Sequence, residues 1–89
     1  MMDAASNNAA AEEVILARLR DVFRAELDDD GLAICVDTRQ ADIKAWDSLA
    51  HIRLVNGIES AFDFQFSLSE IEEINSVRQF VDAIRERLL

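Results

Sequence analysis

The sequence predicts an all-α protein, a bundle of three longer helices and one short helix. Three segments repeat apolar residues at every third or fourth position, which is the period of an amphipathic helix. Two Ser-x-x-Glu/Gln capping boxes precede helical segments, and such boxes mark helix N-termini. A chain of 89 residues forms one domain, so the apolar stripes must face one another around a common core.

The first predicted helix begins near Glu12 and ends at the turn formed by residues 28–31. Residues 1–10 are small and polar without a periodic pattern, so we expect a disordered leader ahead of a folded domain over residues 11–89. Two acidic residues at the predicted start suit the positive end of a helix dipole. Residues 32–46 show no period, and an irregular connection of this length is often functional.

The remaining helices are predicted from Ser48 to Phe62, over residues 67–74 and over residues 76–88. The first of these carries an apolar stripe, and the other two open with the capping boxes Ser67-Leu68-Ser69-Glu70 and Ser76-Val77-Arg78-Gln79. Gly57 lies inside a helix, where it costs about 1 kcal/mol relative to Ala. We therefore expect a close backbone contact at Gly57.

Charge and cysteine usage exclude several functions. The chain has 18 acidic and 9 basic residues, and a net charge of −9 argues against nucleic acid and for basic partner surfaces. Its one cysteine, Cys35, cannot form an internal disulfide, and its apolar neighbours predict an inert buried thiol. No apolar run is long enough to span a membrane and no signal peptide is recognisable, so we expect a cytoplasmic protein without membrane partners.

The sequence contains few residues in patterns that could serve in catalysis or bind a metal. His51, the one histidine, follows Ser48 by three positions on a predicted helix, but Val55 stands where a group orienting the histidine would be needed. A Ser–His hydrolase is therefore a weak alternative, and we expect His51 to be a solvated surface residue. The acidic run at residues 28–31 lacks the ligand spacing of a calcium loop. The sequence predicts no catalytic residues, no metal site and no enzyme.

Asp47 and Ser48 are both able to cap the helix that follows the long loop. If Asp47 caps it, Ser48 takes the first helical position and its hydroxyl points outward. Backbone N–H groups and the helix dipole favour negative charge there, so a phosphodiester on Ser48 would be well tolerated. The alternative is that Ser48 is only a cap, in an acidic helical interaction module without a prosthetic group.

The triplet Asp47-Ser48-Leu49 and the sequence after it resemble the acyl carrier protein family. Beyond the triplet, the resemblance is carried by a turn rich in phenylalanine at residues 62–66, a short acidic helix and the segment 74–77 before the last helix. It extends over nearly the whole folded chain. The resemblance implies a four-helix bundle with a short third helix, in which Ser48 carries a 4′-phosphopantetheine arm attached by a phosphopantetheinyl transferase, flanked by Asp47 and Leu49.

The resemblance also implies a discrete, monomeric carrier that shuttles thioester-linked intermediates between a loading ligase or synthase and other enzymes. Fatty acyl, polyketide and aminoacyl cargo all stay open. Residues 48–62 are neutral, with Arg53 and Glu59 as their formal charges, whereas carriers of fatty acid synthesis have an acidic helix there. We infer a dedicated pathway and docking that relies more on apolar surface than on charge. The predicted docking residues are Trp46, Leu49, Ile52 and Arg53, with Asp47, Asp63, Glu70, Glu72 and Glu73 as charges at the rim.

Overall fold

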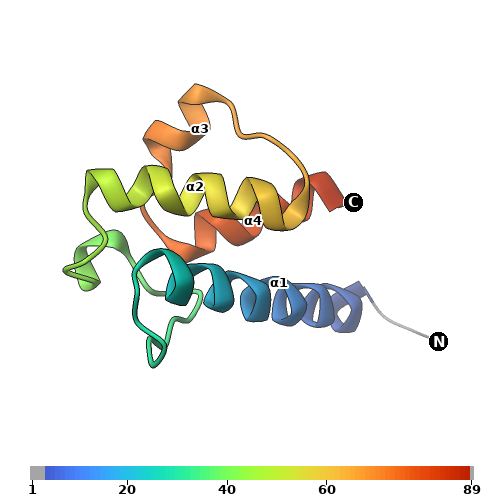
Figure 1. Cartoon of the computed structure of the whole chain (residues 1–89). Coiled ribbons are helices and arrows are strands. Elements are labelled where there is room, and N and C mark those ends of the chain that lie inside the picture. The colour runs from blue at the N-terminus through green and yellow to red at the C-terminus, as the bar shows by residue number, and fades with distance from the viewer. Residues whose placement is uncertain (1–3, 89) are drawn as a thin grey trace.

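A computed structural model describes the backbone of residues 4–88 and the side chains of residues 11–87. Four α-helices and one short 3₁₀ helix make up the described part (Figure 1): α1 (Ala4–Glu26), η1 (Gln40–Asp42), α2 (Ser48–Phe62), α3 (Leu68–Glu73) and α4 (Val77–Leu88). The described residues form no strand, and their one isolated β-bridge pairs Arg39 with Ser76. The predicted all-α fold with a short third helix is confirmed.

Helix α1 begins earlier than the sequence pattern predicts. It starts at Ala4, so residues 4–10, expected in a disordered leader, are helical, while residues 1–3 lie outside the described part. The alanine-rich start has high helix propensity although it lacks an apolar stripe. Glu12 is therefore inside the helix rather than at its positive end, and it forms an ion pair with Arg78 of α4 at 2.6 Å. The boundary of the domain at residue 11 stays a prediction.

The long connection between α1 and α2 is tied to the far end of the chain. Asp28, with a positive φ of 53°, turns the backbone after α1. Gln40 donates its backbone N–H to the carbonyl of Asn75 at 2.8 Å, and Val77 donates to the carbonyl of Thr38 at 2.9 Å. These bonds hold the connection against the start of α4, beside the start of α2.

Cys35 lies in this connection, where its thiol is exposed rather than buried as predicted. Its backbone N–H donates to the hydroxyl of Thr38 at 3.0 Å, which holds residues 35–38 in a turn. The apolar residues beside Cys35 share the burial unequally, since Ile34 is buried and Val36 is half-buried. The prediction of a buried thiol is therefore wrong, because the burial in this segment falls on the neighbours of Cys35.

The core lies between α1, α2 and α4, and α1 packs against both other helices (Figure 1). Of the two predicted capping boxes, the one at α3 forms completely and the one at α4 forms only in half. The Ser67 hydroxyl and the Glu70 carboxylate each accept the backbone N–H of the other residue. At α4, Gln79 donates its N–H to Ser76 Oγ, but its side chain accepts the N–H of Asn75 instead. The largest fully buried side chains are those of Ile15, Leu19, Phe23, Leu54, Ile58, Val77, Phe80, Val81 and Ile84.

Candidate functional site

The start of α2 has the arrangement that the sequence predicts. Asp47 has extended backbone angles and is the N-cap, and its Oδ1 accepts the backbone N–H of Ala50 at 2.8 Å. Ser48 is the first residue of the helix and is exposed. No acidic residue lies in the first turn of α2. The Ser48 hydroxyl therefore stands in solvent at a helix end whose free N–H groups favour a negative group.

Trp46 corrects the sequence interpretation, because it is 2% exposed and cannot serve as the predicted partner contact. Its indole stacks on Phe80 of α4 with ring centroids 6.1 Å apart, and it meets the ring of Phe23 of α1 edge to face at 5.1 Å. The tryptophan thus fixes the end of the long connection in the core, two residues before Ser48. Because the apolar residues of this segment have no period, no sequence pattern indicates which of its side chains turns inward.

His51 is a second correction, because it is 8% exposed rather than solvated. Trp46 donates its indole Nε1–H to Nδ1 of His51 at 2.9 Å. The other ring nitrogen, Nε2, lies 2.9 Å from the backbone carbonyl of Ile71 in α3. A carbonyl only accepts and an indole N–H only donates, so His51 is the neutral tautomer with its proton on Nε2. With both nitrogens engaged, His51 is not placed to act as a base for Ser48.

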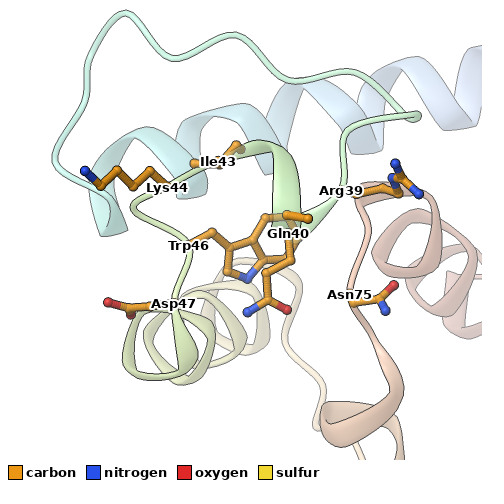
Figure 2. A pocket seen from close by; sticks show the side chains of 8 residues that line it. Arg39, Gln40, Ile43, Lys44, Trp46, Asp47 and Asn75 are labelled. Atoms are coloured by element: carbon orange, nitrogen blue, oxygen red, sulfur yellow. The ribbon is translucent and has the colours of Figure 1, made fainter.

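Two open grooves flank the start of α2. The larger, of about 700 Å³, lies on the side of the long connection (Figure 2), where the Trp46 indole and the Gln40 side chain stand between Asp47 and Lys44 on one side and Arg39 on the other. The smaller, of about 410 Å³, includes Ser48 itself and runs towards α3. Its lining residues are Gln40, Ser48, His51, Ile52, Ile71, Glu72, Ile74 and Asn75.

Near Ser48, the outer face of α2 exposes two apolar side chains and one cation. Leu49 is 69% exposed and Ile52 is 48% exposed, and Arg53 beside them is also exposed. Glu59, the other charged residue of α2, is half-buried and accepts the backbone N–H of Phe66 at 2.9 Å. Of the residues predicted for docking on this side, Leu49, Ile52 and Arg53 are therefore accessible to a partner and Trp46 is not, and docking at this surface stays a prediction.

The predicted rim acids differ in their surroundings. Asp63, Glu72 and Glu73 are exposed, and Asp63 forms the left-handed C-cap of α2 with φ 57°. Glu70 instead forms an ion pair with Arg87 of α4, and the hydrogen bond from Arg87 lowers the pKa of the Glu70 carboxyl below its ordinary value, with help from the backbone N–H of Ser67. Glu70 is thus engaged within the bundle.

A phosphodiester on Ser48 fits these surroundings. The helix end offers N–H groups, Ser48 is exposed, and the neighbouring groove contains the cationic side chains of Arg39 and Lys44. Among the described residues, no group of three or more His, Cys, Asp or Glu side chains could hold a metal ion. In the same part of the chain, no helix is long and apolar enough to cross a membrane.

A small helical bundle that presents a serine at the start of its second helix is the architecture of a carrier for a covalent arm. The family model described as "Phosphopantetheine attachment site" matches residues 15–84, and the chain belongs to this family. A solved structure of a holo acyl carrier protein from Geobacter metallireducens is similar, with a TM-score of 0.75 and 33% sequence identity over 82% of this chain and 84% of that chain. Among the curated proteins, none matches the chain significantly.

The chain is therefore a non-catalytic carrier protein of the acyl carrier type, with a covalently attached 4′-phosphopantetheine. Carriers of this type work with a phosphopantetheinyl transferase and with partner enzymes.

Proposed function

We propose that Ser48 is the residue to which the 4′-phosphopantetheine is attached. The observation that carries the proposal is that, at the start of α2, the Asp47 carboxylate caps the helix and leaves the Ser48 hydroxyl free and exposed. Among the residues whose side chains the structure describes, the other serines either act as caps or do not directly follow an N-cap. Ser67 and Ser76, for example, both accept backbone N–H groups at the starts of α3 and α4.

The attachment chemistry requires only the Ser48 hydroxyl from this chain. Its Oγ forms a bond to the phosphorus of coenzyme A that bears the pantetheine, and the pyrophosphate P–O bond breaks. The 3′,5′-diphosphate of adenosine leaves with that electron pair, and the transferase takes up the hydroxyl proton. The attached arm ends in a thiol that holds acyl groups as thioesters.

Intact-mass measurement after incubation with coenzyme A and a phosphopantetheinyl transferase tests the assignment. We expect the wild type to gain one phosphopantetheine, and Ser48→Ala to gain none. Ser69→Ala is the matched control, because Ser69 is also exposed near a helix start, and it should be modified like the wild type. Equal modification of Ser48→Ala, or an unmodified wild type, would overturn the proposal; an unmodified wild type would favour an interaction module without an arm.

We further propose that the chain carries acyl or aminoacyl intermediates between enzymes of a dedicated pathway. The support is the outer face of α2, where Leu49 and Ile52 are exposed and Arg53 is the exposed charge. A partner that recognises this face relies on apolar contact more than on basic residues. Loading assays with the ligases or synthases encoded beside the gene, read by mass of the loaded arm, identify the cargo.

A further inference from the structure

We propose that His51, as its neutral tautomer, positions the segment that carries Ser48 by holding Trp46, and that protonation of His51 releases this hold. The consequence for the carrier rests on the proposed role of Ser48, but the geometry does not. Trp46 precedes the N-cap of α2 and His51 follows it, so their hydrogen bond of 2.9 Å closes a loop around Asp47 and Ser48. Together with the cap itself, this bond fixes where α2 begins.

The hydrogen bond between Trp46 and His51 exists only while Nδ1 carries no proton. The indole N–H can donate but cannot accept, so Nδ1 must be the acceptor. Protonation would place a second N–H opposite the indole N–H at 2.9 Å, where two donors face each other. Trp46 is 2% exposed, so water cannot readily replace the lost acceptor in this position. The ring or the indole must then move.

The hydrogen bond on the Nε2 side of the imidazole is compatible with protonation of Nδ1. In a longer helix the carbonyl of Ile71 would accept the N–H of residue 75, but Asn75 donates to Gln79 Oε1 at 2.7 Å. Nε2–H of His51 fills that place near the C-terminal end of α3. The Nε2–H remains a donor in the imidazolium, and a cation is favoured near a helix C-terminus. Protonation therefore keeps His51 on α3 and acts selectively on Trp46.

The groups that contact the ring are uncharged. Trp46 stacks on it from the long connection at 6.0 Å, Phe80 of α4 lies 5.9 Å away, and α3 contributes the carbonyl of Ile71. Among the titratable groups of the surrounding elements, the Asp47 carboxylate caps α2 through the N–H of Ala50 and the Glu72 carboxylate lines the groove beside His51. The cationic side chains of Arg39 and Lys44 line the groove that contains Trp46. Within the described structure neither carboxylate binds an imidazole nitrogen, so neither is placed to accept a hydrogen bond from a protonated Nδ1.

NMR spectroscopy of the full apo chain tests the proposal, because the chain has one tryptophan and one histidine. We expect the ring nitrogens to show a protonated Nε2 and a bare Nδ1 at pH 8. On acidification from pH 8 until the imidazole is protonated, the exchange rate of the indole N–H, divided by that of a free indole at the same pH, should rise about fivefold or more as one hydrogen bond is lost. The amide resonances of Asp47 and Ser48 should move with the same midpoint as the imidazole.

Two variants separate positioning from a merely structural role. His51→Asn offers an amide oxygen near the place of Nδ1 and does not titrate, so the indole N–H should stay protected throughout the titration. His51→Phe removes the acceptor, and the protection should be lost at every pH. In the mass assay, the modification rate of the wild type is divided by that of His51→Asn at the same pH, which removes the transferase's own pH dependence. This ratio should fall as the pH falls.

Three results would overturn the proposal. The first is a proton on Nδ1 at pH 8, and the second is a pH midpoint of the indole N–H that differs from that of the imidazole. The third is an indole N–H in His51→Asn whose protection still changes with pH. The NMR measurements require no coenzyme A, so they stand or fall independently of the assignment of Ser48.

Discussion

Gly57 of α2 lies against Val22 of α1 so closely that a Cβ on the glycine would stand 2.9 Å from Cγ1 of Val22. The same Cβ would meet the Glu26 side chain at 3.2 Å. The close contact that the sequence predicts at this glycine is therefore confirmed. It allows α1 and α2 to pack along their length and holds α2, with Ser48 at its start, on the core.

Gly57→Ala is expected to destabilise the fold by about 1–3 kcal/mol, the usual cost of overpacking, although alanine is the better helix former. Val22 is β-branched and stiff, so its Cγ1 cannot turn away cheaply. Urea unfolding followed by circular dichroism measures the change. In a Val22→Ala background the same Gly57→Ala change should be neutral or stabilising. Equal destabilisation in both backgrounds would show that the contact with Val22 is not the cause.

Asp47→Ala is expected to cost about 1 kcal/mol, because the N–H of Ala50 loses the side-chain oxygen that caps α2. Asp47→Asn keeps an oxygen in the same place and should recover most of the stability. Thermal unfolding of both variants measures the difference. If the alanine and asparagine variants unfold alike, the capping bond contributes nothing to stability.

The sequence predicted most of what depends on local chemistry. Capping residues and apolar periods act over a few positions, so Asp47 as the N-cap, Ser48 as the first helical residue and the box at the start of α3 were all found. Trp46 and His51 were misassigned because their burial depends on distant partners. His51 binds a carbonyl 20 residues away, and Trp46 stacks on Phe80 of α4. A single tryptophan at the end of a segment without a period gives no indication of these contacts.

Replacing Glu70 by Gln is expected to reduce stability at neutral pH by at most about 1 kcal/mol, since its ion pair with Arg87 is partly exposed. The glutamine retains an oxygen for the N–H of Ser67, so the change removes mainly the charge. The hydrogen bond from Arg87 lowers the pKa of Glu70 in the folded state. The stabilisation is therefore present above the unfolded pKa of about 4.3 and is lost as the pH falls through the lower folded-state value.

Denaturant unfolding of wild type and Glu70→Gln between about pH 7 and pH 2 measures this linkage, across the ordinary carboxyl range. The two curves should converge at the acidic end. A constant difference across the range would mean that the charge of Glu70 does not contribute.

The exposed thiol of Cys35 should react with one equivalent of a maleimide in the folded apo chain, without denaturant. The arm adds a second thiol, so the chain carrying the arm should react with two equivalents. Cys35→Ser should show none without the arm and one with it. Mass spectrometry counts the adducts, and an apo wild type that reacts only after unfolding would contradict the exposure of Cys35.

Arg53→Glu is expected to slow modification by the phosphopantetheinyl transferase about fivefold in kcat/KM, the effect of one rim charge. The outer face of α2 exposes the apolar residues Leu49 and Ile52 and no acid. A partner that is complementary to this face therefore has no basic group that could form an ion pair with the new carboxylate. Arg20→Glu on α1 makes the same charge change on another helix and should have little effect. Arg53→Gln should fall between wild type and Arg53→Glu. An acceleration by Arg53→Glu that fades at high salt would instead identify a basic partner surface and refute the apolar docking face.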